Sequence, residues 1–146
     1  MNPDGAGSAR TAILTELHGL RASIADIQGS VLATTDGLVL VHDLGDAETF
    51  GVEPEGVAAL AAVNLGLSQR IADTASHGDL VQTVIRGTFG QVITCAVSDR
   101  ALMSVLVRRP DEVAGLGQAI TAVGDRIAPL VLDLWQDDAA HWRAPA

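Results

Sequence analysis

Three short apolar runs in the second half of the chain constrain its fold more than any other feature. They span residues 80–86, 91–97 and 102–107, and only a few residues separate each run from the next. Connections this short join neighbouring antiparallel strands, because a parallel crossover needs about a dozen residues or more. The sequence therefore predicts three consecutive antiparallel strands. The last is apolar on both faces, so we expect helices on both sides of the sheet.

The first half of the chain predicts a helix followed by a β-hairpin. The helix, over residues 8–25, is indicated by four apolar residues at helical spacing: Ile13, Leu17, Leu20 and Ile24. Asp36-Gly37 then lies between two β-prone runs, residues 30–35 and 38–42. This dipeptide favours a two-residue type I′ turn, in which both central residues take positive φ.

Residues 53–77 predict a helix that starts next to Pro54 and whose two sides differ in composition. One side carries bulky apolar residues, which we expect to pack on the sheet: Val57, Leu60, Val63, Leu67, Ile71 and Ala75. The other side carries small and polar residues: Ala58, Ala59, Ala62, Gly66, Gln69, Arg70 and Asp73, with Leu65 at its edge. Because small side chains let a second backbone come close, we expect this side to meet a partner.

A last helix is predicted to open at Pro110 and to bend or end early at Pro129. Its buried stripe would consist of Val113, Leu116, Ile120, Val123, Ile127 and Leu134. The predicted fold is a three-layer α/β/α sandwich of the α+β class, with element order α-β-β-α-β-β-β-α and a five-stranded antiparallel sheet. We expect one domain over residues 8–136, between flexible tails at residues 1–7 and 137–146.

The charge of the chain excludes several classes of partner. Its formal net charge is −9, with nine arginines and no lysine among 146 residues. An acidic surface disfavours nucleic acid and anionic membranes, which need clustered cations. No apolar run is long enough to span a membrane, and the N-terminus lacks the regions of a signal peptide, so we expect a soluble cytoplasmic protein.

The sequence holds no recognisable catalytic, cofactor or metal site. Cys95 is the single cysteine, and we interpret it as a buried structural thiol. The four histidines lack metal-ligand spacing, and no glycine-rich loop has phosphate-binding spacing. Asn64 lies beside the bulky stripe of the predicted helix. We favour a side chain satisfied by a backbone group over a device that fixes helix register.

The order of elements and several turns resemble the roadblock family of dynein light chains and its bacterial relatives. The matching residues are Gly29 before the first strand, Asp36-Gly37, the alanine-rich middle helix and Ser98-Asp99-Arg100 before the last strand. The resemblance covers residues 8–135 and rests on structural motifs, none of them catalytic. Profilin-like and longin domains are similar in fold.

This resemblance implies a homodimer whose sheets join through the third strand, with the two middle helices side by side. Together with the small-residue helix side, it gives an expected interface of Ala58, Ala62, Leu65, Gly66, Gln69, Val81, Thr83 and Ile85. It also implies a non-enzymatic module that regulates or scaffolds a Ras-like small GTPase, alongside a sensor-kinase-like protein. The alternative is a profilin-like or longin-like domain that senses a small molecule, and an enzyme is the least favoured class.

Overall fold

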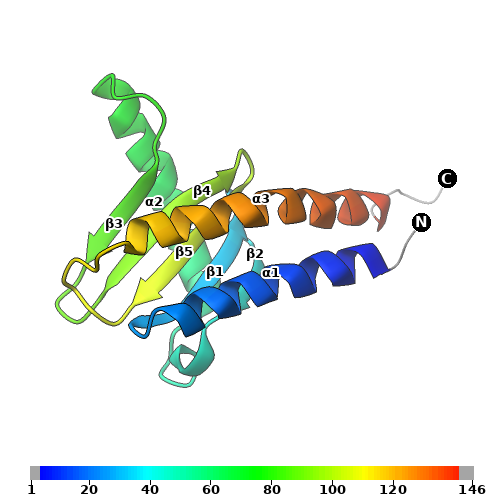
Figure 1. Cartoon of the computed structure of the whole chain (residues 1–146). Coiled ribbons are helices and arrows are strands. Elements are labelled where there is room, and N and C mark those ends of the chain that lie inside the picture. The colour runs from blue at the N-terminus through cyan, green and yellow to red at the C-terminus, as the bar shows by residue number, and fades with distance from the viewer. Residues whose placement is uncertain (1–3, 142–146) are drawn as a thin grey trace.

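The structure, a computed structural model, describes the backbone of residues 4–141 and the side chains of residues 7–135. Figure 1 shows three helices around one sheet. The elements are α1 Asp4–Ser23, β1 Ile27–Thr34, β2 Val39–Asp43, the short 3-10 helix η1 Gly45–Ala47, α2 Pro54–Thr74, β3 Gln82–Arg86, β4 Gln91–Ser98, β5 Ala101–Val107 and α3 Leu116–His141. The predicted element order is confirmed.

The sheet is antiparallel throughout, with strand order β2-β1-β5-β4-β3. The long β1 pairs with β5 at the centre, so the first hairpin and the three-strand meander form one sheet. All seven residues of β5 are buried, as its apolar sequence predicts. β2 and β3 are the edge strands, and β3 is the strand through which the family resemblance joins two sheets.

Two separate cores lie on the two faces of the sheet and produce the expected three layers. Helices α1 and α3 lie side by side over one face, where Leu17, Met103 and Ile127 are fully buried. Helix α2 lies over the other face and packs, together with Ala47 of η1, on Val31, Leu102 and Leu106. The predicted buried stripe of α3 is confirmed for five of its members: Leu116, Ile120, Val123, Ile127 and Leu134.

The predicted orientation of α2 is wrong. Its small side faces the sheet, since Ala58 is 0% exposed and Ala61 and Leu65 are buried. The bulky stripe points to solvent and leaves Leu60 73% exposed. The physical reason is close approach. A Cβ on Gly37 would stand only 3.1 Å from the Cα of Ala59, so bulky side chains would not fit between this helix and the first hairpin.

Three local predictions also differ from the structure. The first hairpin has a three-residue loop. The Thr34 N–H donates to the carbonyl of Leu38, and the Thr34 carbonyl accepts from the N–H of Gly37. Within this loop only Gly37 takes positive φ. Helix α3 begins at Leu116 instead of Pro110, and it continues through Pro129. Residues 4–7 and 137–141, assigned to tails by sequence, belong to α1 and α3, while residues 1–3 and 142–146 lie outside the described part.

Candidate functional site

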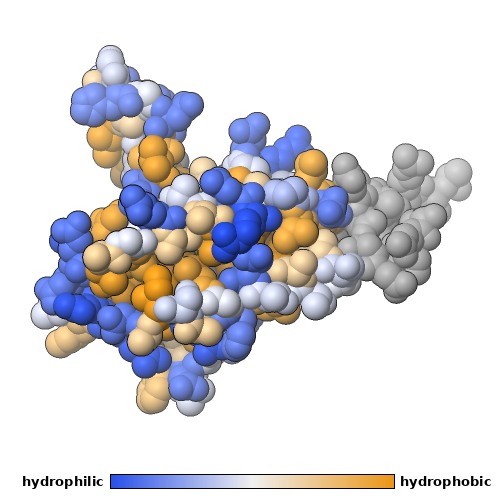
Figure 2. Space-filling view, viewed as in Figure 1, coloured by the Kyte–Doolittle hydropathy of each residue, from blue (hydrophilic) through white to orange (hydrophobic). Residues whose placement is uncertain are grey.

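The outward side of α2 carries a row of bulky apolar side chains, which we call the α2 stripe: Leu60, Val63, Leu67 and Ile71. Each of the four is more than half exposed. Their 3-4-4 spacing places them in one line along the helix. Figure 2 shows apolar side chains on the part of α2 that projects from the sheet. Contiguous apolar surface of this kind marks an interaction site more often than it marks ordinary surface.

Strand β3 lies beside α2 and forms an open edge of the sheet. Alternate side chains of a strand point to opposite faces. Thr83 points towards α2, because its hydroxyl accepts a hydrogen bond from the Asn64 amide at 3.0 Å. Gln82, Val84 and Arg86 point to the other face and line a hollow with the start of α3. The edge therefore offers apolar and polar side chains on both faces.

Two hydrogen bonds from α2 hold β3 and the segment before it. Besides the bond to Thr83, the Gln69 side chain accepts the backbone N–H of Leu80 at 2.9 Å. Its amide nitrogen also donates to Asp73 at 2.8 Å. Asn64 is satisfied, as expected, but by a side-chain hydroxyl instead of a backbone group. Because of these bonds, α2 and the β3 edge form one continuous surface.

The opposite edge of the sheet is partly closed by side chains from α1. Arg10 donates to the carbonyl of Leu40 on β2 at 2.7 Å. Arg21 donates two hydrogen bonds to the Asp43 carboxylate at the end of β2, at 2.9 and 3.2 Å. The hydrogen bond with Asp43 raises the pKa of Arg21. Charged side chains along an edge discourage pairing with another strand, so the two edges of this sheet differ.

The eight residues predicted to form the interface fall into two groups. On β3 and just before it, Val81 and Ile85 are exposed and Thr83 is half-buried. On α2, Ala58 and Leu65 are buried against their own sheet, which is the consequence of the reversed helix orientation. The remaining three, Ala62, Gly66 and Gln69, line a hollow of about 220 Å³ beside the β4–β5 turn.

Sequence reasoning missed the α2 stripe as a surface because bulky apolar residues at helical spacing are usually core. A signal was available in the same helix. Ala58, Ala61 and Leu65 also form an apolar row, at 3-4 spacing. A helix with two apolar rows can bury only one of them against a single sheet. In this structure the bulkier row is the one left exposed.

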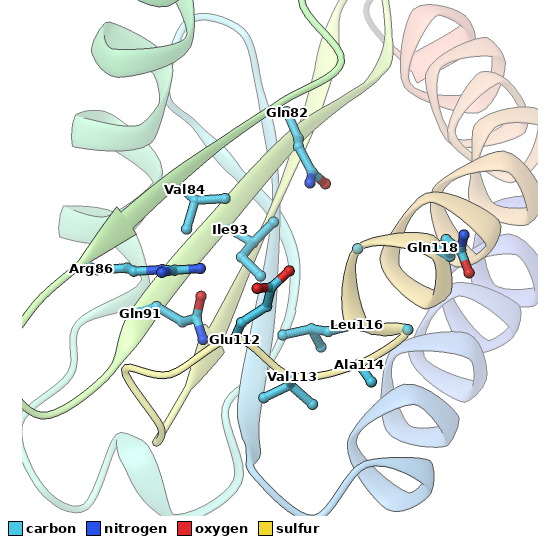
Figure 3. Close-up of a pocket in the computed structure, with 12 residues that line it drawn as sticks. Gln82, Val84, Arg86, Gln91, Ile93, Glu112, Val113, Ala114, Leu116 and Gln118 are labelled. Carbon is cyan, nitrogen blue, oxygen red and sulfur yellow. The ribbon is translucent and has the colours of Figure 1, made fainter.

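A hollow of about 360 Å³ lies on the α3 side of the sheet. Figure 3 shows Gln82, Arg86 and Gln91 extending from β3 and β4 towards Glu112, which precedes α3. The Gln91 amide donates to the carbonyls of Arg109 and Asp111, at 2.9 and 2.7 Å, and so fixes the β5–α3 connection. The Oε1 atom of Gln82 is buried without a hydrogen-bond partner. The hollow therefore combines an apolar floor with several polar groups.

The titratable residues of the described part show no catalytic arrangement. Cys95 is buried, and desolvation raises the pKa of its thiol to about 11, which keeps it protonated and unreactive at neutral pH. His42 lies 3.2 Å from Glu48 at the surface. In the described residues, no group of three or more histidine, cysteine or acidic side chains could hold a metal ion. None of the described helices is long and apolar enough to cross a membrane.

Comparisons with known proteins agree with this architecture. The family model of the Roadblock/LC7 domain matches residues 13–107. No curated protein sequence matches the chain.

Solved structures are similar in fold at low sequence identity. A Roadblock/LC7 domain from Streptomyces avermitilis is 21% identical with a TM-score of 0.70, over 81% of this chain and 96% of that chain. MglB from Myxococcus xanthus is 16% identical with a TM-score of 0.73, over 85% and 98%. An MglB in a tetrameric arrangement is 13% identical with a TM-score of 0.75, over 86% and 92%.

The family match spans the first hairpin, α2 and all five strands, which are the elements that build the candidate surface. Members of this family are generally non-catalytic, in keeping with a site made of apolar side chains and an open strand. The chain belongs to the Roadblock/LC7 domain family.

Proposed function

We propose that this protein is a non-enzymatic homodimeric module that regulates or scaffolds a Ras-like small GTPase. The observation that carries the proposal is the α2 stripe beside the open edge of β3. The proposal corrects the interface expected from sequence. The helix would contribute its bulky side, Leu60, Val63, Leu67 and Ile71. Val81, just before β3, and Thr83 and Ile85 on β3 would remain part of the interface, as the sequence predicts.

Two features of the surface support a second copy of this chain as one occupant. An open strand edge is completed by another strand, and an identical edge on a symmetry mate provides one. The α2 stripe lies on the same side of the sheet as Thr83, so joining two β3 strands brings two stripes together over the joined sheet. Specific dimers bury about 1,600 Å², and a strand edge plus a helix face can supply such an area.

The GTPase follows from the family resemblance, since bacterial roadblock proteins commonly act beside Ras-like GTPases. The proposed mechanism is binding: contact with the dimer would favour one conformer of the GTPase over another. No catalytic side chain or bound cofactor is required for this. A sensor-kinase-like protein is the second partner that the resemblance implies, and the site of action would be the cytoplasm.

Sedimentation equilibrium and a binding assay test the two halves of this proposal. The parent protein should form a dimer at micromolar concentration, and a monomer at every accessible concentration would refute the homodimer. A purified Ras-like GTPase from the same genome should then bind the dimer. Its affinity is measured separately in the GTP-loaded and the GDP-loaded form. A difference in affinity supports regulation, and equal affinity supports scaffolding. Absence of binding to every Ras-like GTPase of that genome would refute the GTPase partner.

The hollow in Figure 3 favours the alternative, a domain that senses a small molecule. Its size suits a small ligand, no larger than an amino acid. Polar groups above its apolar floor come from Gln82, Arg86, Gln91 and Glu112. Thermal denaturation in the presence of a metabolite panel separates the two candidates. A ligand that raises the melting temperature in a saturable manner, and loses this effect in Glu112→Ala, would support the sensor.

A further inference from the structure

We propose that two copies join their β3 strands in one register, centred on Val84, and that Arg86 of each copy binds Gln82 of the other. This inference rests on the proposed homodimer and specifies its central contact. Two observations and one geometric requirement lead to it: the direction of the free backbone groups of β3, two polar side chains without partners, and the two-fold symmetry that a homodimer imposes.

The backbone groups of Gln82, Val84 and Arg86 face the open edge. Gly87 donates its N–H to the carbonyl of Gly90 at 2.8 Å, so Gly87 faces β4. Residues of an antiparallel strand alternate between facing one neighbour and facing the other. Ile85 and Thr83 therefore also face β4. The even-numbered residues present six N–H and C=O groups to a second copy.

Symmetry restricts the register to few choices. In a two-fold interface, if residue i meets residue j, then residue j meets residue i, so one residue of β3 must meet itself. Both α2 helices must lie on the same face if their stripes are to be buried together. Residues opposite each other then point to the same face, which permits any residue of β3 as the centre, and Thr83, Val84 or Ile85 pairs the most of the strand.

Complete pairing selects Val84 among these three. β3 runs from Gln82 to Arg86, so Val84 is its middle residue. With Val84 at the centre, all six free backbone groups find partners within the strand. With Thr83 or Ile85 at the centre, one end of the strand would meet residues outside it, and two of the six groups would face no strand partner.

The same register joins two polar side chains that lack partners in one copy. Gln82 and Arg86 would stand opposite each other, with Cβ atoms about 5 Å apart. The Oε1 of Gln82 has no hydrogen-bond partner. In the part of the chain whose side chains are described, no carboxylate pairs with the exposed Arg86 guanidinium. Gln82 borders two hollows, so its amide has room to turn towards the edge.

This pairing would give the interface specificity as well as area. A guanidinium donates and an amide oxygen accepts, so the two contacts are complementary and occur twice in one dimer. A register shifted by one step in either direction would place Gln82 or Arg86 opposite Val84. The polar group opposite Val84 would then be covered without a hydrogen bond, which disfavours that alternative.

Disulfide trapping reads the register directly. All variants carry Cys95→Ala, which removes the native thiol. In Val84→Cys the two thiols would lie on residues about 5.5 Å apart between Cα atoms, within disulfide range. In the matched variant Ile85→Cys, position 85 meets position 83 of the other copy. The two thiols would be about 7–8 Å apart, too far to bridge. Under mild oxidation we expect a covalent dimer for Val84→Cys and none for Ile85→Cys.

Charge substitutions at position 82 provide a second measurement that does not depend on the cysteine variants. Gln82→Glu places a carboxylate opposite Arg86, and we expect its dimer Kd to fall by about tenfold. Gln82→Arg places two guanidinium groups opposite each other, and its dimer Kd should rise by about tenfold or more. Adding Arg86→Glu to Gln82→Arg restores opposite charges and should restore the dimer.

The outcomes separate this inference from the proposed function. A parent that remains monomeric overturns both. A parent that dimerises, with oxidation trapping Ile85→Cys or Thr83→Cys instead of Val84→Cys, overturns the register and leaves the dimer. A stable dimer in which neither charge variant at position 82 changes Kd overturns the Gln82–Arg86 contact.

Discussion

The Asn64 amide on α2 donates a hydrogen bond of 3.0 Å to the Thr83 hydroxyl on β3. This bond connects the helix layer to the outermost strand of the sheet. Thr83 pairs with Thr94 on β4, whose own hydroxyl lies 2.7 Å from that of Ser104 on β5. A row of polar side chains thus runs from the centre of the sheet to its open edge. The row gives the edge strand a defined position beneath α2.

We predict that Asn64 and Thr83 are energetically coupled. Asn64→Ala and Thr83→Val should each lower the free energy of unfolding by about 1 kcal/mol, because each leaves one polar partner unpaired. The double variant should lose less than the sum of the two single losses. Urea denaturation of the four proteins measures the coupling. Additive losses would show that the bond contributes nothing to stability.

Substitutions on the two faces of α2 should affect different properties, dimerisation on the exposed face and folding on the buried face. Leu67→Asp places a charge in the α2 stripe and should weaken the dimer by about 2 kcal/mol or more, roughly thirtyfold in Kd, with little change in folding. Leu65→Ala, on the buried face, should instead destabilise the fold by about 2–4 kcal/mol. Sedimentation equilibrium and urea denaturation measure the two effects.

A matched control for the stripe lies on the opposite layer of the molecule. Leu132 on α3 is 57% exposed, close to the 58% of Leu67. Leu132→Asp makes the same chemical change outside the proposed interface. Its dimer Kd should equal that of the parent. Equal weakening by both variants would indicate a general effect of charge on association.

The fold was largely predictable because its signals are local. Short connections require antiparallel strands, and the six apolar residues of β5 require cover on both faces. The side of α2 that faces the sheet was not predictable from the helical wheel alone. Ala58 and Leu67 both belong to apolar rows, yet Ala58 is buried and Leu67 is exposed. Which row is buried depends on how closely the first hairpin approaches the helix. That distance is a property of the tertiary structure.

The start of α3 was mispredicted for a similar reason. Pro110 followed by acidic residues is a good local signal for a helix N-terminus. In the folded chain, however, the Gln91 amide binds the carbonyls of Arg109 and Asp111 from the neighbouring strand. These contacts hold the segment in a loop until Leu116. Sequence patterns within the segment carry no record of Gln91, which is eighteen residues away from Arg109.

Gly29 should tolerate no side chain. A Cβ at this position would collide with the backbone of Asp43 and Leu44, where β1 passes the end of β2. Backbone atoms cannot move aside cheaply, so Gly29→Ala should destabilise the fold by about 2 kcal/mol or more. Gly19 on α1 is the control, because no atom would contact its Cβ. Gly19→Ala should stabilise the helix by up to about 1 kcal/mol. Thermal denaturation distinguishes the two, and equal effects would contradict the steric argument.

The Arg21–Asp43 pair should depend on the shape of the guanidinium. Arg21 donates through two nitrogens to both oxygens of Asp43, whose side chain is 15% exposed. Lysine keeps the charge but cannot form this two-pronged contact. Arg21→Lys should therefore lower the free energy of unfolding by about 1 kcal/mol in urea denaturation. The exposed Arg70→Lys serves as the control and should have no effect. If Arg21→Lys keeps the full stability of the parent, the two-pronged geometry adds nothing beyond the attraction between the two charges.

The buried thiol of Cys95 should make folding less favourable at high pH. Desolvation raises the pKa of Cys95 from 9.0 to about 11 in the folded protein. Below about pH 9, the folded and unfolded states both keep the proton, and stability does not depend on this group. Between about pH 9 and 11 the unfolded state loses the proton while the folded state keeps it, so the free energy of unfolding falls as the pH rises.

The expected loss is about 3 kcal/mol across that interval. Cys95→Ala removes the titrating thiol. Subtracting its unfolding free energy from that of the parent cancels the pH dependence that all other side chains contribute. Urea denaturation at pH 8, 9, 10 and 11 gives the difference between them. That difference should stay constant up to about pH 9. Above it, the parent should lose about 3 kcal/mol of unfolding free energy relative to Cys95→Ala. A constant difference up to pH 11 would mean that solvent reaches the thiol through local opening of β4 at little energetic cost.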